Sequence, residues 1–157
     1  MLDSLGVKVD YISGTSMGAI VGGLYASGYT GKDIEKIILD TDFYNLISNQ
    51  NNRAESSFFN KSVDKYLLKV PIKNGKATLP TSISSGQKNL YLLKELFKNV
   101  SNINDFSKLP IPFMCVATNL ETGKIKIFEN GDLSESILAS SAFPSLMDPV
   151  KIGDSIY

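Results

Sequence analysis

Apolar residues in the first part of the chain follow a strand pattern and then a helix pattern. Residues Lys8–Ser13 contain β-forming side chains and stop at a glycine, which predicts a short strand. Apolar positions at helical spacing predict a helix over Met17–Ser27, with Gly28 as its left-handed stop. A second helix is predicted from Thr30, because Asp33 stands three residues later, close to a capping box.

The middle of the chain is more polar. Residues Asn45–Ser57 are rich in asparagine and predict a mobile loop. A hairpin is predicted next, because Tyr66–Ile72 and Lys76–Leu79 flank Asn74–Gly75, a favoured two-residue turn. Apolar positions on one face then predict an amphipathic helix over Leu90–Val100.

Two strands are predicted after this helix. Residues Phe113–Thr118 follow Pro110 and Pro112 and lack polar alternation, so we expect both faces of that strand to be covered. Residues Lys124–Phe128 form the second strand.

The last segments complete the pattern. Asp132 and Glu135 predict a capping-box start for a helix over Leu133–Ser141. A hairpin over Val150–Tyr157 turns at Gly153–Asp154. The alternation of strands and helices, without an internal repeat or a linker, predicts one layered α/β domain over residues 1–157.

Composition narrows the function. The chain has 157 residues, is 43% hydrophobic and carries a formal net charge of +0, so it lacks the basic excess of a nucleic-acid-binding protein. It has no histidine, which excludes a Ser-His-Asp triad built from these residues and any histidine-based metal site. No metal or cofactor is expected. Cys115 has no partner for an internal disulfide, and its apolar strand suggests a small buried side chain.

The sequence Gly14-Thr15-Ser16-Met17-Gly18 is a G-x-S-x-G motif between a predicted strand and a predicted helix. That context is the one in which such a serine serves as a nucleophile. We expect both glycines to be needed sterically, and the helix N-terminus to favour a developing oxyanion. A purely structural glycine-rich turn is the alternative.

Nucleotide binding is the other alternative for this turn. A P-loop requires a Lys-Ser or Lys-Thr pair, which does not follow Gly18, and the G-x-G-x-x-G pattern is also absent. Gly18, Gly22 and Gly23 are better explained by close packing of the helix against the sheet.

The motif and several later segments resemble those of bacterial patatin-like phospholipases. The resemblance covers nearly the whole chain and is carried, in order, by Asp10–Ile20, Leu109–Phe113, Ala117–Gly123, Asn130–Leu133, Ala139–Ser140, Pro144 and Pro149–Val150. It implies a three-layer α/β/α sandwich that is incomplete here. It also implies a lipid acyl hydrolase that uses a Ser-Asp dyad, with Ser16 as nucleophile.

The resemblance further implies two parts that the 157 residues do not contain. One is a glycine-rich oxyanion loop before Met1, and the other is an Asp-Gly-Gly motif after Tyr157. Asp154 is a weak substitute for that aspartate, because it is followed by serine and fits a hairpin turn. We therefore expect residues 1–157 alone to show little or no esterase activity.

Two alternative functions stay open at this point: a non-catalytic or binding fragment, and an α/β-hydrolase whose histidine lies beyond Tyr157. On the favoured interpretation the partner is a lipid or other acyl-ester substrate. The resemblance is compatible with a membrane surface as partner, and with a membrane-associated or exported location of the full-length protein. Asn119, Ser140 and Ser141 are expected to have structural roles.

Overall fold

The computed structural model describes residues 5–41, 72–73, 76–77, 86–143 and 147–157, and its strands and helices alternate along the chain. The α/β fold class predicted from the sequence is therefore confirmed. In chain order the elements are β1 (Ile12–Gly14), α1 (Met17–Ala26), α2 (Gly31–Asp40), β2 (Ile72–Lys73), β3 (Lys76–Ala77), α4 (Gln87–Leu96), the 3-10 helices η2 (Lys98–Val100) and η3 (Phe106–Lys108), β4 (Phe113–Thr118), β5 (Ile125–Phe128), α5 (Leu133–Ser141), β6 (Lys151–Ile152) and β7 (Ser155–Ile156).

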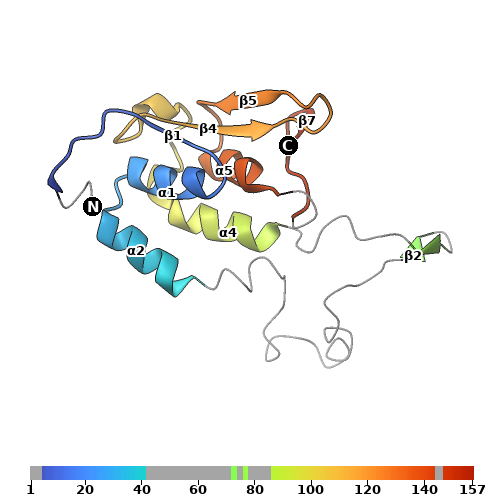
Figure 1. The fold of residues 1–157 in the computed structure, drawn as a ribbon, viewed down its shortest axis with the longest axis horizontal. Coiled ribbons are helices and arrows are strands. Elements are labelled where there is room, and N and C mark those ends of the chain that lie inside the picture. The colour runs from blue at the N-terminus through green and yellow to red at the C-terminus, as the bar shows by residue number, and fades with distance from the viewer. Residues whose placement is uncertain (1–4, 42–71, 74–75, 78–85, 144–146) are drawn as a thin grey trace.

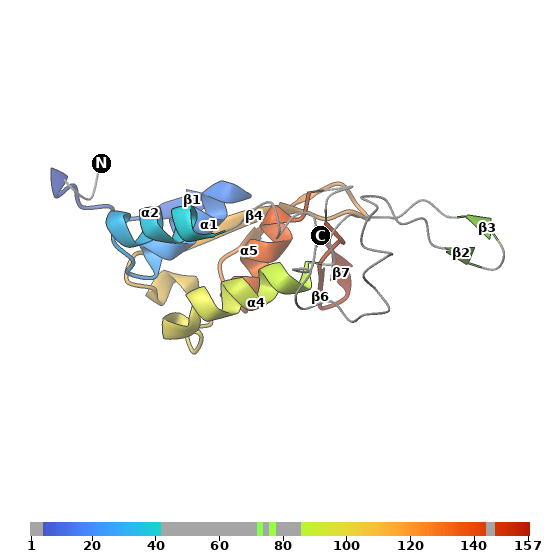
Figure 2. The same ribbon diagram turned by 90° about the horizontal axis from the view of Figure 1, so that it is seen from below.

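Strands β1, β4 and β5 form the sheet that positions the site. Their order is β1-β4-β5, with β1 parallel to β4 and β4 antiparallel to β5. Helices α1, α2, α4 and α5 gather on one side of this sheet (Figure 1). Helix α5 contacts both β4 and α4 and lies between them (Figure 2). The first strand of the chain is thus joined to a strand a hundred residues later, with Ile12 opposite Phe113.

Strand β1 is shorter than predicted, because it starts at Ile12 rather than Lys8. The N–H of Ile12 donates to the carbonyl of Pro112 at 2.9 Å, which is where the ladder with β4 begins. Pro110 and Pro112 have no N–H and cannot extend that ladder toward the N-terminus. The β-forming side chains before Ile12 therefore have no described strand to pair with.

Side chains alternate between the two faces of β4. Phe113, Cys115 and Ala117 are buried beneath the helices, whereas Met114 and Val116 on the other face are half-buried. No described helix covers that second face (Figure 1). In the described residues, helices cover one face of the sheet only. The prediction that both faces of β4 are covered is therefore confirmed for one face and not for the other.

The core lies between the sheet and helices α1, α4 and α5. Its largest fully buried side chains are Leu24, Phe97, Phe106, Phe113, Cys115 and Ile137. Two glycines let α1 approach closely. A Cβ at Gly22 would lie 2.9 Å from Ile12, and one at Gly23 would lie 2.7 Å from Ile137. Close packing is therefore confirmed for Gly22 and Gly23, although Gly23 meets helix α5 rather than the sheet. For Gly18 the same prediction is wrong, because a Cβ there would meet no atom within 4 Å.

Local signals set the helix ends, with two corrections. Helix α2 has the full capping box of Thr30 and Asp33. For α5, only half of the predicted box is present: the Asp132 carboxylate accepts the Glu135 N–H at 2.9 Å. Helix α4 begins at Gln87, earlier than predicted, because Gly86 takes a left-handed conformation before it, and it ends at Leu96.

The two predicted hairpins are present as short antiparallel pairs, β2–β3 and β6–β7. The predicted turn at Asn74–Gly75 and the predicted loop over Asn45–Ser57 lie outside the described residues. Gly153 takes a positive φ of 60° in the terminal turn, as a tight turn requires. No helix in the described part of the chain is long and apolar enough to cross a membrane.

Candidate active site

Ser16 lies in the turn between β1 and α1, as the motif predicts. Its backbone has φ 52° and ψ −124°, and it is the one non-glycine residue with positive φ among those described. A residue held in such a conformation costs on the order of 1–3 kcal/mol, and such strain clusters at functional sites. The Ser16 side chain is exposed, so the turn presents its hydroxyl to solvent.

The two motif glycines are not equivalent. A Cβ at Gly14 would lie 2.5 Å from the carbonyl oxygen of Gly18 and 2.8 Å from the Cα of Ala19. Gly14 is therefore required by the tightness of the turn. A Cβ at Gly18 would meet no atom within 4 Å, so the expectation that both glycines are needed sterically is wrong for Gly18. The chain turns back over Gly14, whereas Gly18 faces open space.

Distant residues hold the backbone of the turn. The N–H of Ser16 donates to the hydroxyl of Ser140 at 3.0 Å, and that hydroxyl donates to the carbonyl of Val116 at 2.6 Å. The Thr15 hydroxyl donates to the same Val116 carbonyl at 3.3 Å. Ser140 was predicted to have a structural role within its helix. It instead supports the strained residue directly, which no local sequence signal reveals because 124 positions separate the two serines.

The N-terminus of α1 is left open at the same point. Gly18 and Ala19 donate their N–H groups back to the carbonyls of Thr15 and Ser16, each at 2.9 Å. The N–H of Met17 donates to no described residue, and the first turn contains no acidic side chain. The Met17 N–H, without a described partner, and the positive end of the helix dipole therefore lie next to the Ser16 hydroxyl.

An apolar cavity of about 280 Å³ opens beside Ser16. Its walls come from helices α1, α2, α4 and α5 and from the segment after α5. The lining residues are Ser16, Met17, Ile20, Val21, Leu24, Ile37, Ile38, Thr41, Asn89, Leu92, Leu93, Leu96, Leu138, Ser141, Phe143 and Met147. Most of these side chains are aliphatic, so the cavity suits a hydrocarbon chain that ends at the serine.

Comparisons with known proteins show the family of this chain. Residues 1–157 match the family described as patatin-like phospholipase. The chain belongs to that family. A protein of the NTE family from Mycobacterium bovis is 27% identical to this patatin-like chain over 147 residues, which is 94% of the chain and 33% of the relative. A lysophospholipase, NTE1 of Debaryomyces hansenii, is 29% identical over 155 residues, covering 99% of the chain and 8% of that protein. The chain thus spans about a third of the mycobacterial relative and a small part of the yeast one.

The base expected in a patatin-like dyad is not found near Ser16 in the described residues. No described side chain forms a hydrogen bond with the Ser16 hydroxyl, and no carboxylate lines its cavity. Asp154 lies exposed between β6 and β7, in the hairpin turn where the sequence placed it. It is not among the residues that line the cavity at Ser16.

Two other candidate residues of this patatin-like domain are structural. Burial raises the pKa of Cys115 to about 12, so its thiol is neutral and is no nucleophile near neutral pH. The side-chain oxygen of Asn119 accepts the N–H groups of Glu121 and Thr122 at 3.0 and 2.9 Å, which closes the turn before β5 as predicted. Within the described residues, no three His, Cys, Asp or Glu side chains gather as metal ligands would.

Proposed function

We propose that the protein carrying this domain is a lipid acyl hydrolase, with Ser16 as its nucleophile. The proposal rests on the position of this serine. It is exposed in a strained turn, lines the opening of an apolar cavity and lies beside a helix N-terminus without a side-chain cap. Family membership and the lysophospholipase relative support a lipid ester as substrate.

The reaction follows from this arrangement. The Ser16 hydroxyl oxygen attacks the ester carbonyl carbon while its proton passes to a base, and the carbonyl oxygen becomes an oxyanion. The free Met17 N–H stabilises that oxyanion together with the α1 dipole. Collapse of the intermediate expels the alcohol and leaves an acyl-Ser16 ester, which water hydrolyses to release the fatty acid and restore the serine.

The base in this proposal is the aspartate of a Ser-Asp dyad. Histidine is absent from the 157 residues, and no described carboxylate reaches Ser16. We propose that this aspartate lies outside the described residues, in the Asp-Gly-Gly motif that the family resemblance implies. A second oxyanion donor would come from a glycine-rich loop of the same origin.

Ser16→Ala in the complete gene product tests the nucleophile. Hydrolysis of p-nitrophenyl butyrate should fall by several orders of magnitude, because the attacking atom is gone. The neighbouring exposed Ser13 on β1 gives a matched control, since Ser13→Ala removes the same hydroxyl from the strand before the turn. Full activity in a folded Ser16→Ala protein would exclude the proposal.

The same assay separates the alternatives for the base. Residues 1–157 alone are expected to show little or no activity, whereas the complete gene product is active. If the 157 residues alone match the complete protein and still require Ser16, a base lies among them, and Asp154→Asn is the next variant to test. A histidine-dependent hydrolase would instead lose activity on histidine modification.

The cavity entrance also supports action at a lipid surface. Met17, Ile38 and Phe143 line the cavity, yet their side chains remain 51%, 40% and 65% exposed. Exposed apolar residues around a site that accepts lipid are suited to contact with a membrane or micelle. Hydrolysis should therefore rise steeply once an ester substrate aggregates, and Phe143→Ser should weaken that rise. An unchanged dependence on aggregation in Phe143→Ser would count against surface contact.

A further inference from the structure

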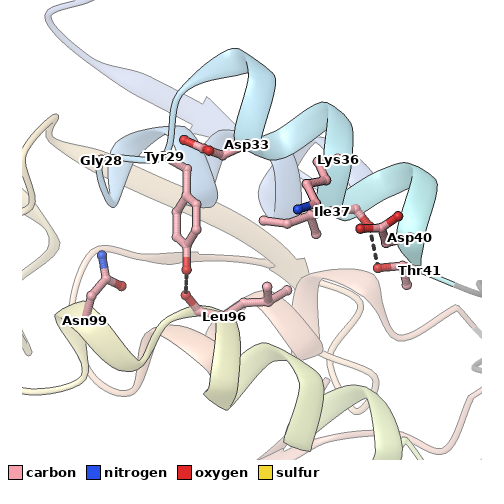
Figure 3. Close-up of a pocket in the computed structure, with 9 residues that line it drawn as sticks. All are labelled: Gly28, Tyr29, Asp33, Lys36, Ile37, Asp40, Thr41, Leu96 and Asn99. Atoms are coloured by element: carbon pink, nitrogen blue, oxygen red, sulfur yellow. Dashed lines mark hydrogen bonds between the residues drawn. The ribbon is translucent and has the colours of Figure 1, made fainter.

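Two cavities of the domain meet at the same residues. The cavity beside Ser16 and a second, more polar cavity of about 690 Å³ are both lined by Ile37, Thr41 and Leu96 (Figure 3). Asp33, Lys36, Asp40 and Asn99 give the second cavity its polar character. Side chains shared by both linings stand between an apolar space and a solvated one.

Figure 3 shows how these shared residues lie. Ile37 comes from α2 and Leu96 from the end of α4, and their side chains extend into the space between the two helices. Both backbones are fixed: the Tyr29 hydroxyl donates to the Leu96 carbonyl at 2.6 Å, and the Thr41 hydroxyl donates to the Ile37 carbonyl at 2.5 Å. Thr41, the third residue that lines both cavities, uses its hydroxyl in the second of these bonds, so the two aliphatic side chains supply the rest of the separation between the cavities.

Leu96 lies at the end of the apolar cavity remote from Ser16. Helix α4 enters the lining at Asn89, whose amide contacts Met147 at 3.5 Å. At the other end, the Phe97 ring approaches Gly23, only 3.3 Å from where a Cβ would stand. Helices α1 and α4 thus run in the same direction, and the cavity follows them from Ser16 toward Leu24 and Leu96.

The length and the volume of the apolar cavity give similar values for the number of acyl-chain carbons that it can hold. The α1 lining from Ser16 to Leu24 spans about 12 Å at a helical rise of about 1.5 Å per residue. A staggered hydrocarbon with C–C bonds of about 1.5 Å advances roughly 1.3 Å per carbon, so about nine carbons fit that length. A dry cavity of about 150 Å³ holds a benzene ring, so a volume near 280 Å³ holds on the order of ten carbons.

We propose that Ile37 and Leu96 form a partition that sets the acyl-chain length of the substrate. The inference rests on the proposed function, since it takes the cavity beside Ser16 as the acyl site. Medium chains end at the partition with their methyl group against aliphatic side chains. A long chain has to displace Ile37 and Leu96 and enter the polar cavity, where it loses apolar contact. The two residues determine specificity and take no part in the chemistry.

Opening the partition tests this role. The double variant Ile37→Ala/Leu96→Ala joins the two cavities, and each complete protein is assayed with p-nitrophenyl octanoate and palmitate in the same detergent micelles. The measured quantity is the ratio of kcat/KM for palmitate to that for octanoate. It should rise by at least about tenfold over wild type, the lower end of what a change in pocket size gives.

A larger side chain in the partition should shift the chain-length preference in the opposite direction. This second variant keeps the proposal testable if the double alanine variant does not fold. Leu96→Phe adds bulk at the same place and should lower the octanoate-to-butyrate ratio. Leu39→Ala is the matched control, because it truncates an aliphatic residue of α2 that is 77% exposed and lines neither cavity. Its ratios should equal those of the wild type.

The outcomes separate the two proposals. If the wild type hydrolyses none of the esters, the proposed function fails. If the wild type is active and both partition variants keep its chain-length profile, the partition is refuted while the function stands. Opposite shifts in the opened and filled proteins, with none in Leu39→Ala, support the partition.

Discussion

Helices α1 and α2 are neighbours in the chain and each is 10 residues long, yet they begin in opposite ways. Helix α2 starts at Thr30, whose side chain and that of Asp33 form both hydrogen bonds of a capping box. Helix α1 starts at Ser16, with no side-chain cap and no acid in its first turn. Side chains at the start of α2 satisfy the N–H groups of Thr30 and Asp33, whereas the Met17 N–H at the start of α1 donates to no described residue.

This difference separates stability from function. A capped start lowers the free energy of the folded state and uses donors that could otherwise bind a ligand. At α1, the free Met17 N–H lies beside an exposed hydroxyl, and other parts of the fold supply the support that a cap would give. The helix that is weaker by local rules is the one that carries the candidate chemistry.

Of the changes that test this contrast between the two helices, Gly14→Ala in the turn before α1 is expected to have the largest effect. Gly14→Ala places a Cβ against the backbone of Gly18 and Ala19, which cannot move aside without shifting the helix. We expect at least a hundredfold loss of esterase activity, because a displaced reacting group costs about that much. Activity and thermal unfolding of the complete protein provide the measurement.

Gly18→Ala is the control for that change, since its Cβ meets nothing within 4 Å. Its midpoint of unfolding should not fall, and the better helix propensity of alanine favours a small rise. Equal destabilisation by the two substitutions would mean that the turn is less tight than the Gly14 contacts indicate.

A moderate effect is expected at Ser140, which supports the backbone of α1 from outside the helix. Ser140→Ala removes the acceptor for the Ser16 N–H and should lower kcat about tenfold, the order of one net hydrogen bond. KM should change little, because Ser140 does not line the cavity. Ser136→Ala is the matched control: it removes another α5 hydroxyl, which donates to the Asp132 carbonyl at 2.8 Å. If both variants lose kcat, the effect of Ser140→Ala reflects the stability of α5 and not support of the Ser16 backbone.

A smaller effect is expected at the start of α2. Thr30→Ala removes the cap and should cost about 1 kcal/mol of unfolding free energy. For a chain of this size, that corresponds to a fall of about 2–4 °C in Tm. If the proteins are compared well below their Tm, kcat should match that of the wild type. A large loss of kcat would show that α2 takes part in the chemistry and would end the contrast between the two helices.

The smallest effect is a pH dependence at Asp33. Hydrogen bonds from the Thr30 side chain and backbone lower the pKa of this carboxyl in the folded state. Its contribution to stability is therefore complete above the unfolded pKa, about 3.9, and is lost as the pH falls through the lower folded value. The Tm difference between wild type and Asp33→Asn should be present at neutral pH and shrink in acid. A difference that does not change with pH would contradict the assignment.

The sequence predicted best what local chemistry decides. Helix α2, strand β4 and the terminal hairpin follow from a cap, an apolar run and a turn glycine, and the elbow at Ser16 follows from its motif. Strand β1 was predicted too long because its partner begins only after Pro112.

The walls of the site could not be predicted in the same way. The Ser140 contact and the meeting of Ile37 with Leu96 join segments that are remote in sequence. Such contacts have no periodicity and no motif. They arise only from the way in which α2, α4 and α5 pack around α1.

The long reach of the turn's hydrogen bonds has a consequence for the order of events during protein synthesis. Thr15 and Ser16 are synthesised before their partners Val116 and Ser140, which lie 101 and 124 positions later. Contacts so distant in sequence form late, since a long loop has to close before they can be made. The turn at Ser16 would therefore lack these supporting hydrogen bonds until Val116 and Ser140 have been synthesised. The strained backbone of Ser16 is expected to form only at that stage, when most of the described domain is present.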